Sequence, residues 1–531
     1  MANDCTITAN ARLDARDELI AKLSLHGSFT DAELILHAYA AWGEECVKHL
    51  IGDFAFAIRD SRARRLFCAR DHFGVEPFYF THVANEFDFS SSLNELRLNP
   101  RVSDTLNELA VGDYLLFGVN QDLSTTIFKD IQRLSPGHSL TVANGSITIR
   151  RYWTPEVSTE ERFPDPESYV ERFSELLSRA VSDRMDSDRV AILMSGGLDS
   201  TSVAAIAREH LADGSSLQAC SVVYDRLIPD QERHYSTAAA NHLGIPISYV
   251  VADRYSLFDE QVPGDMNQPE PFLLSPLTAQ FHNVLRLCAN HSNIALTGWD
   301  ADSFMNEPER SHVKIKTILK RMLRKRTREP LLPQWLDESF AQRTNLRERY
   351  QEVFYPQKGA EQSPGKTRPA ALRALNSKVW TSLFEGYAQG ATKLQLDVRH
   401  PLIDVRLVEF LLAIPPVPWC VNKHILRRAM KDRLPPAVLN RNKTPLAGDP
   451  ALQLARHASV RWLDSFEVNP QLRNFVNLKL RQSIADEQTS DGLWANLRVL
   501  ALNYWLTNSQ PFQRPAENQV SNNRAYKTSI A

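Results

Sequence analysis

The sequence carries almost no net charge and no long hydrophobic run. Its 531 residues have a formal net charge of −2 at pH 7, so no overall electrostatic field favours nucleic acid or a membrane as a partner. No apolar stretch approaches the roughly 18 residues of a membrane-spanning helix, and the nearest one, VEFLLAIPPVPW, is broken by prolines. The first residues, MANDCTITANARLD, lack the apolar core of a signal peptide. We therefore expect a cytoplasmic protein with no nucleic-acid or membrane partner.

Cysteine is also scarce, and internal repeats and long low-complexity segments are absent from the sequence. No two cysteines form a C-x-x-C pair, and the six are Cys5, Cys46, Cys68, Cys220, Cys288 and Cys420. This wide spacing predicts reduced thiols rather than disulfides, and it argues against a zinc site.

What is present is the composition of a large globular enzyme, with 43% hydrophobic and 23% charged residues. A chain of this length is expected to contain two or more domains. The polar, proline-bearing stretch TPEVSTEERFPDPE predicts a linker between domains at 1–155 and 165–510, and the polar tail at 511–531 is expected to be loose. Short alternating runs such as FAFAIRD predict an antiparallel α+β first domain. VAILMSG, QACSVVYD, ISYVVAD and NIALTG alternate with helical stretches, which predicts a parallel α/β sheet, with helices dominating beyond residue 370.

The run LMSGGLDST, at 193–201, follows a predicted buried strand and opens a predicted helix. Adjacent glycines let the backbone approach an anion closely, and the amides at the start of a helix favour negative charge. A carboxylate fits such a loop if it holds Mg²⁺, which then bridges to phosphate oxygens. The pattern predicts phosphate binding, with an ordinary strand–helix turn as the alternative. The residues concerned are Ser195, Gly196, Gly197, Asp199, Ser200 and Thr201.

The segment SGGLDST is similar to the SGG-[LI]-D-S-[ST] loop of the PP-loop ATP pyrophosphatases. That family holds the β- and γ-phosphates of ATP and transfers AMP, so the resemblance implies ATP and Mg²⁺ as cofactors. It also implies that Asp199 and Asp302 hold the Mg²⁺. Asp302 follows the predicted strand NIALTG, and the carboxyl ends of parallel strands are where such sheets bind ligands. Adenosine is expected to contact backbone at strand ends, at Met194, Val222, Thr297 and Gly298.

Both halves of the chain resemble the asparagine synthetase family almost end to end. DFAFAIRD, ARDHFGVEPFYF and LSPGHSLTV resemble its glutamine amidotransferase domain, whereas SGGLDST, NHLGIPI, DVRHPLID and RNKTP resemble its synthetase domain. The resemblance implies an Ntn-type amidotransferase-like α+β domain, then a PP-loop (adenine nucleotide α-hydrolase-like) parallel α/β domain with a helical C-terminal part. Lys443, in LNRNKTPL, matches the catalytic lysine, whose charge would stabilise the α-phosphate and the oxyanion. PQWLDESFAQR and ANARLDARDELIAKL are most similar to the family's lasso-peptide cyclases.

The N-terminal half departs from the residues that glutamine hydrolysis needs. That activity uses a cysteine directly after the initiator methionine, whose own α-amine acts as the base. Ala2 stands at that position, and Cys5 is not terminal. The family's oxyanion loop corresponds to the segment that starts at Asn10, and its glycine is replaced by Ala11. We expect an inactive glutaminase domain with a structural role, and a gene start assigned too late is the alternative.

The synthetase half departs from asparagine synthetases at Trp299, where those enzymes carry a glutamate that helps manage ammonia. Indole cannot accept a proton, so a large aromatic residue here is expected to line a pocket for a bulkier substrate. Glu385, in SLFEGY, is a candidate replacement base, or else a helix-surface charge. The basic run Lys314–Arg328 predicts a solvated helix face, or a docking face for an acidic or partner peptide.

These motifs together predict an ATP-dependent amide ligase that forms an acyl-adenylate, releases pyrophosphate and lets an amine displace AMP. The favoured interpretation is a lasso-peptide cyclase, which joins a side-chain carboxylate of a precursor peptide to that peptide's new N-terminus. Its expected partners are the precursor, a leader-peptide-binding protein and a leader peptidase. An asparagine synthase (glutamine-hydrolysing) or a β-lactam synthetase-like enzyme is the alternative. A non-catalytic scaffold is the alternative of another class, and Asp199, Asp302 and Lys443 argue against it.

Overall fold

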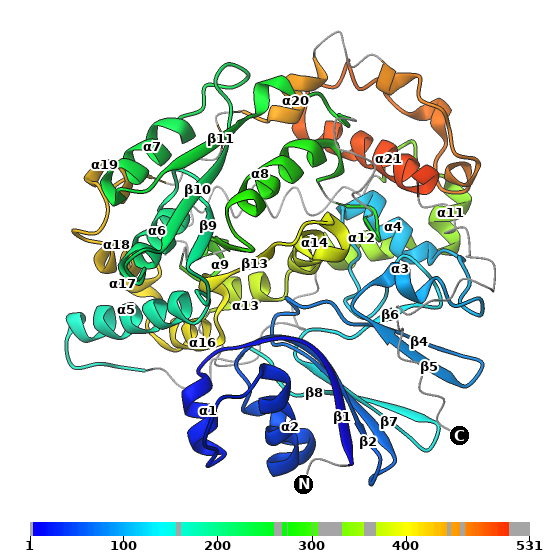
Figure 1. Cartoon of the computed structure of the whole chain (residues 1–531). Coiled ribbons are helices and arrows are strands. Elements are labelled where there is room, and N and C mark those ends of the chain that lie inside the picture. The colour runs from blue at the N-terminus through cyan, green and yellow to red at the C-terminus, as the bar shows by residue number, and fades with distance from the viewer. Residues whose placement is uncertain are drawn as a thin grey trace.

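The fold is taken from a computed structural model of the chain. It describes residues 4–155, 161–259, 268–272, 274–299, 301–305, 332–354, 368–442, 446, 448–456 and 462–508. In Figure 1 the N-terminal domain (blue and cyan) lies below a parallel sheet with its helices, and the C-terminal helix lies beside helices of both parts.

The N-terminal domain is built on a five-stranded antiparallel sheet with the order β1-β2-β3-β7-β8. Successive side chains of β2 point to opposite faces, as the period of a strand requires. Phe54, Phe56 and Ile58 pack beneath α1 and α2, whereas Ala55 and Ala57 face a second sheet with the order β5-β4-β6. The predicted antiparallel α+β arrangement is thus confirmed. The elements are β1 (Cys5–Leu13), α1 (Arg16–Lys22), α2 (Asp31–Trp42), β2 (Gly52–Asp60), β3 (Arg65–Arg70), β4 (Tyr79–Val83), β5 (Glu86–Ser90), α3 (Leu93–Leu96), α4 (Glu108–Phe117), β6 (Gln132–Arg133), β7 (His138–Ala143) and β8 (Ser146–Arg151).

The second half contains a five-stranded sheet with the order β11-β10-β9-β12-β13, in which every pairing is parallel, as predicted. Helices cover both faces of this sheet. Val190 and Ile192 of β9 pack toward α5 and α6, whereas Ala191 packs toward α8 on the other face. The elements are α5 (Pro166–Ser182), β9 (Arg189–Leu193), α6 (Leu198–Glu209), β10 (Ser216–Val223), α7 (Glu232–Leu243), β11 (Ile247–Val251), α8 (Thr278–His291), β12 (Ile294–Thr297) and β13 (Asp397–Arg399).

Helices make up most of the described chain beyond residue 370, again as predicted. One group of them packs against α4 of the N-terminal domain, where Val499 and Leu502 of α21 share a core with Val111 and Leu115. None of the described helices is both long and apolar enough to cross a membrane. The helices described after β12 are α9 (Ala301–Met305), α11 (Glu338–Arg343), α12 (Leu346–Phe354), α13 (Pro369–Leu375), α14 (Lys378–Tyr387), α15 (Gln389–Thr392), α16 (Val405–Ala413), α17 (Pro416–Trp419), α18 (His424–Ala429), α19 (Pro436–Leu439), α20 (Pro450–Ala455) and α21 (Ser490–Asn508).

A buried network of ion pairs joins the two halves. Arg184, which follows α5, lies 3.1 Å from a carboxylate oxygen of Asp14 and 2.9 Å from one of Asp404. Asp14 also pairs with Arg12 of β1, and Asp404, the residue that caps α16, pairs with Arg406 at 2.8 Å. Because Asp14, Arg184 and Asp404 are buried and Arg406 is half-buried, removal of one partner leaves another charge with less compensation in a poorly solvated place.

We expect Asp404→Asn to lower the free energy of unfolding at pH 7 by about 3 kcal/mol, because Arg184 and Arg406 then remain buried with one carboxylate fewer. Burial by itself would raise the pKa of Asp404, but hydrogen bonds and charge from the two arginines lower it far below its usual value. A lowered pKa stabilises the fold above the unfolded-state value of about 3.9. The difference between the two proteins should therefore shrink as the pH falls below about 4, as measured by denaturant unfolding.

The matched control is Glu167→Gln, in the exposed pair with Arg428. Exposed pairs contribute less than about 1 kcal/mol, so this variant should unfold almost as the unmodified chain does. Equal losses in Asp404→Asn and Glu167→Gln would show that the buried network does not hold the halves together.

Candidate active site

A cavity of about 810 Å³ opens at the carboxyl ends of β9 and β12. This edge is where open parallel sheets bind ligands, and the volume lies within the range of small-molecule sites, about 300–1,000 Å³. Seven of the residues predicted to bind ATP or Mg²⁺ line it, namely Ser195, Gly197, Asp199, Ser200, Thr297, Gly298 and Asp302. The structure thus brings the SGGLDST loop and the segment after β12 into one site.

Gly298 allows these two segments to approach one another. A Cβ atom at this position would lie 2.3 Å from both the backbone N and the Cα of Ser200, at the start of α6. No side chain fits in that space, so glycine is required where the end of β12 meets the loop. Gly196 is similarly enclosed, because a Cβ there would lie 2.5 Å from the Cβ of Tyr235.

The hydroxyl groups of the loop form different hydrogen bonds. The Ser195 amide donates to Ser200 Oγ at 3.0 Å, and the Gly197 amide donates to Ser195 Oγ at 3.1 Å, so these two serines shape the loop at the cavity wall. Thr201 Oγ1 donates to the carbonyl oxygen of Gly197 at 2.8 Å, and its side chain is fully buried. The prediction that the Thr201 hydroxyl contacts a phosphate is therefore wrong, because that hydroxyl is bonded to the first turn of its own helix.

Three other predicted residues lie next to the cavity without lining it. Met194 is buried in the core between α5 and α6, and its amide donates to Cys220 of β10. Val222 packs with residues that follow β10 and β11. The Gly196 amide donates to Glu232 Oε2 at 2.6 Å. Met194 and Val222 therefore pack among other residues of the fold, and Gly196 contacts the Glu232 carboxylate; none of the three lines the cavity.

Lys423, a residue that the sequence analysis missed, joins the two predicted metal ligands. Its ammonium lies 2.5 Å from Asp199 Oδ2 and 2.8 Å from Asp302 Oδ1. The Lys423 backbone has a φ of 55° at the start of α18, and its amide donates to the carbonyl oxygen of Met305 at 2.9 Å. Sequence alone gives no reason to select Lys423 from among the neighbouring cations.

The geometry of Asp199 and Asp302 fits a divalent cation. Carboxylate oxygens are the ligands that Mg²⁺ prefers, and it takes few of them from protein. These two carboxylates come from α6 and α9 and converge on one positive charge. They therefore form a place for one cation, and Lys423 is the positive charge that the chain itself supplies there.

Further positive charge comes from the segment after α19. Arg441 Nη2 lies 2.6 Å from Glu232 Oε1, and its guanidinium lies over the ring of Tyr235 at 4.2 Å. Arg427 and Arg441 both line the cavity. Lys443, the predicted catalytic lysine, lies outside the described residues, as do the basic run at 314–328 and the tail at 511–531.

Trp299 forms an apolar wall of the cavity, as predicted. Its indole nitrogen donates to the Tyr387 hydroxyl at 3.1 Å, and 37% of the residue is exposed. Burial raises the pKa of Tyr387 to about 12, so the phenol is neutral near pH 7. Leu446, which is 44% exposed, lines the same cavity. The site therefore presents aromatic and aliphatic surface beside the two carboxylates.

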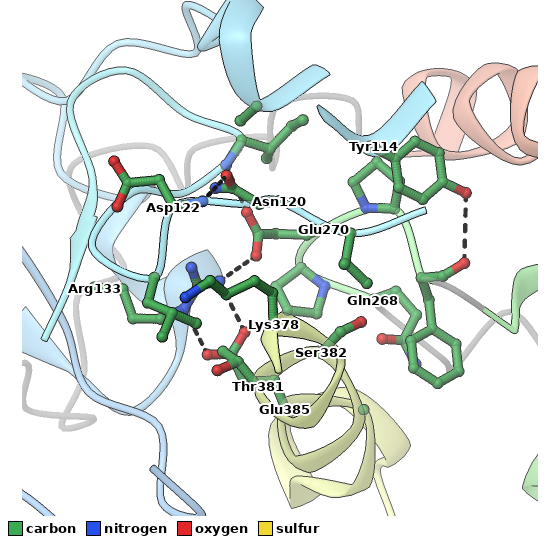
Figure 2. Close-up of a pocket in the computed structure, with 18 residues that line it drawn as sticks. Tyr114, Asn120, Asp122, Arg133, Gln268, Glu270, Lys378, Thr381, Ser382 and Glu385 are labelled. Carbon is green, nitrogen blue, oxygen red and sulfur yellow. Dashed lines mark hydrogen bonds and ion pairs between the residues drawn. The ribbon is translucent and has the colours of Figure 1, made fainter. Parts of the chain in front are cut away.

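Glu385 lies elsewhere, and the prediction that it replaces the missing base is wrong. Arg133 donates from Nε and Nη2 to its two carboxylate oxygens at 2.7 and 2.9 Å (Figure 2). Arg70 Nη2 lies 3.5 Å from Glu385 Oε1. The alternative of a helix-surface charge is also wrong, because the residue is only 6% exposed. Residues two apart in a helix point in directions that differ by about 200° around its axis. Tyr387 therefore reaches the cavity, whereas Glu385 faces the N-terminal domain.

A second cavity, of about 610 Å³, borders the predicted oxyanion segment at Asn10 and Ala11, and its lining contains no cysteine. The side-chain amide of Asn10 donates from Nδ2 to Glu76 Oε2. Cys5 lies at the start of β1, where burial and the charge of Asp60 raise the pKa of its thiol. A raised pKa disfavours the reactive thiolate, and Cys5 is not among the residues that line this cavity.

We expect Lys423→Gln to melt at a lower temperature than the unmodified chain when a chelator is present, because the substitution removes the ammonium that contacts both Asp199 and Asp302. Millimolar Mg²⁺ should restore most of the loss by taking the place of the ammonium. Lys431→Gln, at an exposed lysine, is the control and should show neither effect. Thermal melts of Lys423→Gln that are the same with chelator and with Mg²⁺ would contradict the assignment of a cation site.

Comparison with known proteins gives a family for both halves. The chain is 27% identical over 469 residues to asparagine synthetase [glutamine-hydrolyzing] 3 of Bacillus subtilis, covering 83% of this chain and 75% of that protein. It is 33% identical to a putative asparagine synthetase [glutamine-hydrolyzing] 2 of Methanocaldococcus jannaschii over 42% of this chain and 44% of that protein. A glutamine phosphoribosylpyrophosphate amidotransferase structure from B. subtilis matches at 12% identity over 48% of this chain and 46% of that one, with a TM-score of 0.20, too low to support an argument.

Two family descriptions match the chain. Residues 10–153 match the family described as glutamine amidotransferase domain. Residues 172–507, more than half of the chain, match the family described as asparagine synthase. With Asp199 and Asp302 converging at the carboxyl edge of a parallel sheet, the chain belongs to the asparagine synthase family.

Proposed function

We propose that this ATP-dependent carbon–nitrogen ligase adenylates a side-chain carboxylate of a precursor peptide and closes a macrolactam with the peptide's N-terminal amine. The observation that carries the proposal is the wall formed by Trp299 and Tyr387 beside the two carboxylates. An exposed indole and a neutral phenol offer surface to a bulky substrate, but neither accepts a proton from ammonia at neutral pH.

The chain's own residues suit the adenylation step. Ser195, Gly197 and Ser200 line the cavity where α6 begins, and a helix start favours the β- and γ-phosphates of ATP. Asp199 and Asp302 would hold Mg²⁺, which supplies charge that stabilises the leaving pyrophosphate. Lys423 and Arg441 add fixed positive charge at the same wall. The substrate carboxylate attacks the α-phosphate, and the bond between the α- and β-phosphates breaks.

The second step needs an amine held close to the acyl-adenylate. All three carboxylates of the described cavity lining are already engaged: Asp199 and Asp302 by Lys423, and Glu232 by Arg441 and the Gly196 amide. A strong general base is therefore missing from this part of the wall. Two ends of one peptide that are held in contact react as an intramolecular pair, which can lower a barrier by about 7–11 kcal/mol without such a base.

The N-terminal domain, in this proposal, does not hydrolyse glutamine. Support comes from Ala11 in the oxyanion segment and from the cavity beside it, whose lining contains no cysteine. The domain would then serve as a structural wall, joined to the synthetase half through Arg184 and through Glu385. Without an internal source of ammonia, the amine has to enter as part of a substrate.

One alternative keeps specific support. The named relatives are asparagine synthetases, so an asparagine synthase acting on aspartate is the second candidate, and a β-lactam synthetase-like enzyme acting on another small molecule is a variant of it. A non-catalytic scaffold is disfavoured, because a scaffold has no need of a cavity lined by Asp199, Asp302, Lys423 and Arg441. Expected partners of the proposed cyclase are the precursor, a leader-peptide-binding protein and a leader peptidase.

The decisive test is mass spectrometry of a precursor peptide encoded beside this chain, incubated with the protein, ATP, Mg²⁺ and the leader peptidase. We expect loss of one water, localised to a bond between the first residue and an acidic side chain. Formation of asparagine from aspartate and ammonium by the same preparation, with no change in the peptide, would favour the alternative. Trp299→Glu should shift activity toward ammonia if the indole excludes it.

We expect Asp199→Asn and Asp302→Asn each to abolish pyrophosphate release with the peptide substrate, because each removes charge that holds Mg²⁺. Asp213→Asn, at an exposed position after α6, is the control and should release pyrophosphate normally. Lys443→Ala should bind ATP but turn over at least ~10²-fold more slowly, as expected for loss of a group that stabilises charge in the transition state. Unchanged turnover of Lys443→Ala would exclude it from the mechanism.

A further inference from the structure

A third pocket, of about 180 Å³, lies between the N-terminal domain and the start of α14, and it shares no lining residue with the candidate active site. The N-terminal domain contributes the turns around β3, β6 and β8, and the synthetase half contributes the junction of α13 and α14. Its lining is His72, Phe73, Leu123, Ser135, Pro136, His138, Arg151, Trp153, Pro155, Leu375, Asn376, Ser377, Lys378, Trp380 and Thr381.

Positive charge in this pocket is not matched by acidic side chains. Lys378 and Arg151 both line it, and the lining contains no aspartate or glutamate. Within the part of the chain that the structure describes, no ion pair is found for the side chains of Lys378 and Arg151, and Arg151 Nε donates to the carbonyl oxygen of Trp153 at 3.1 Å. Burial lowers the pKa of Lys378, the charge of Asp122 raises it and the charge of Arg151 lowers it again.

Acidic side chains lie on the other side of Lys378. Lys378 also lines the pocket of Figure 2, together with Asp122, Glu270 and Glu385. Arg133 pairs with Glu270 and Glu385, and Asp122 accepts hydrogen bonds from the amide and the hydroxyl of Ser124. Asp122 stabilises the Lys378 ammonium in part, but none of these three carboxylates lines the pocket that Lys378 shares with Arg151, so an added anion there would pair with both cations.

The floor of the pocket is aromatic. Phe73 lies between the two tryptophans of the lining, with ring centroids 5.1 Å from Trp153 and 6.0 Å from Trp380. The indole nitrogen of Trp153 donates to Glu409, so its ring is held in place. An apolar cavity of about 150 Å³ is large enough for benzene, so this pocket has room for one flat ring with a small charged group.

We propose that this pocket is a second ligand site, which binds a small organic anion: a single ring or short apolar body bearing one carboxylate or one phosphate. The anionic group pairs with Lys378 and Arg151, and the apolar body packs on Phe73, Trp153 and Trp380. The site lies apart from the cavity that holds Asp199, so it can be occupied together with ATP.

Isothermal titration of the full chain with benzoate and with phenyl phosphate tests this, in the presence of a saturating, non-hydrolysable ATP analogue that fills the other site. We expect both probes to bind, and benzamide, the uncharged analogue of benzoate, to bind at least about tenfold more weakly, because it cannot form a charge-assisted contact. Tighter binding of phenyl phosphate would identify a phosphate ester as the ligand class, and tighter binding of benzoate a carboxylate.

Lys378→Gln and Arg151→Gln should each weaken benzoate binding about tenfold, which is the effect of losing one hydrogen bond to a charged group. Arg254→Gln, at an exposed arginine far from this lining, is the matched control and should bind as the unmodified chain does. Arg151 lies on the surface, so its variant keeps the test valid if Lys378→Gln fails to fold. Two results would overturn the proposal: no binding of either probe up to about 10 mM, or binding of benzoate by both variants as tight as by the unmodified chain.

Discussion

The close approach of two backbone segments at Gly298 and Ser200 is the constraint on which the candidate active site depends. Only a residue without a Cβ fits where β12 ends, because any side chain atom there would lie 2.3 Å from the start of α6. This contact places Asp302, on α9, close to Asp199, on α6, so that both carboxylates reach the ammonium of Lys423. Charge of both signs is thereby concentrated at the carboxyl edge of the parallel sheet, next to the loop that is expected to hold phosphates.

Helix α14 divides its residues between the two halves of the protein. Tyr387, at its end, accepts a hydrogen bond from Trp299 and forms the wall of the cavity, whereas Glu385 is held by Arg133 and Arg70 of the N-terminal domain. The N-terminal domain therefore fixes the position of a cavity wall even though its own cavity has no cysteine in its lining. The buried network around Arg184 joins the two halves as well.

Sequence patterns predicted the elements of this fold well, because each is a local property of the chain. The alternation in FAFAIRD predicted a strand of an antiparallel α+β domain, and the run before SGGLDST predicted a buried strand of a parallel sheet; both are confirmed. Asp199, Asp302 and Trp299 were selected from motif resemblance, and all three line one cavity. Resemblance succeeded there because the motifs lie directly at strand ends, where a short segment fixes the position of its own side chains.

The partners of charged side chains were decided only by tertiary structure. Lys423 stands 224 positions from Asp199 along the chain, and no local pattern distinguishes it from the arginines beside it. Glu385 appeared to be a spare base in its sequence context, yet Arg133, 252 positions away, neutralises it. Thr201 appeared to be a phosphate ligand, but its hydroxyl bonds to the preceding turn of its helix. The sequence by itself determined which segments become strands and loops, whereas long-range packing determined which charges meet, because ion pairing depends on distances that no local pattern sets.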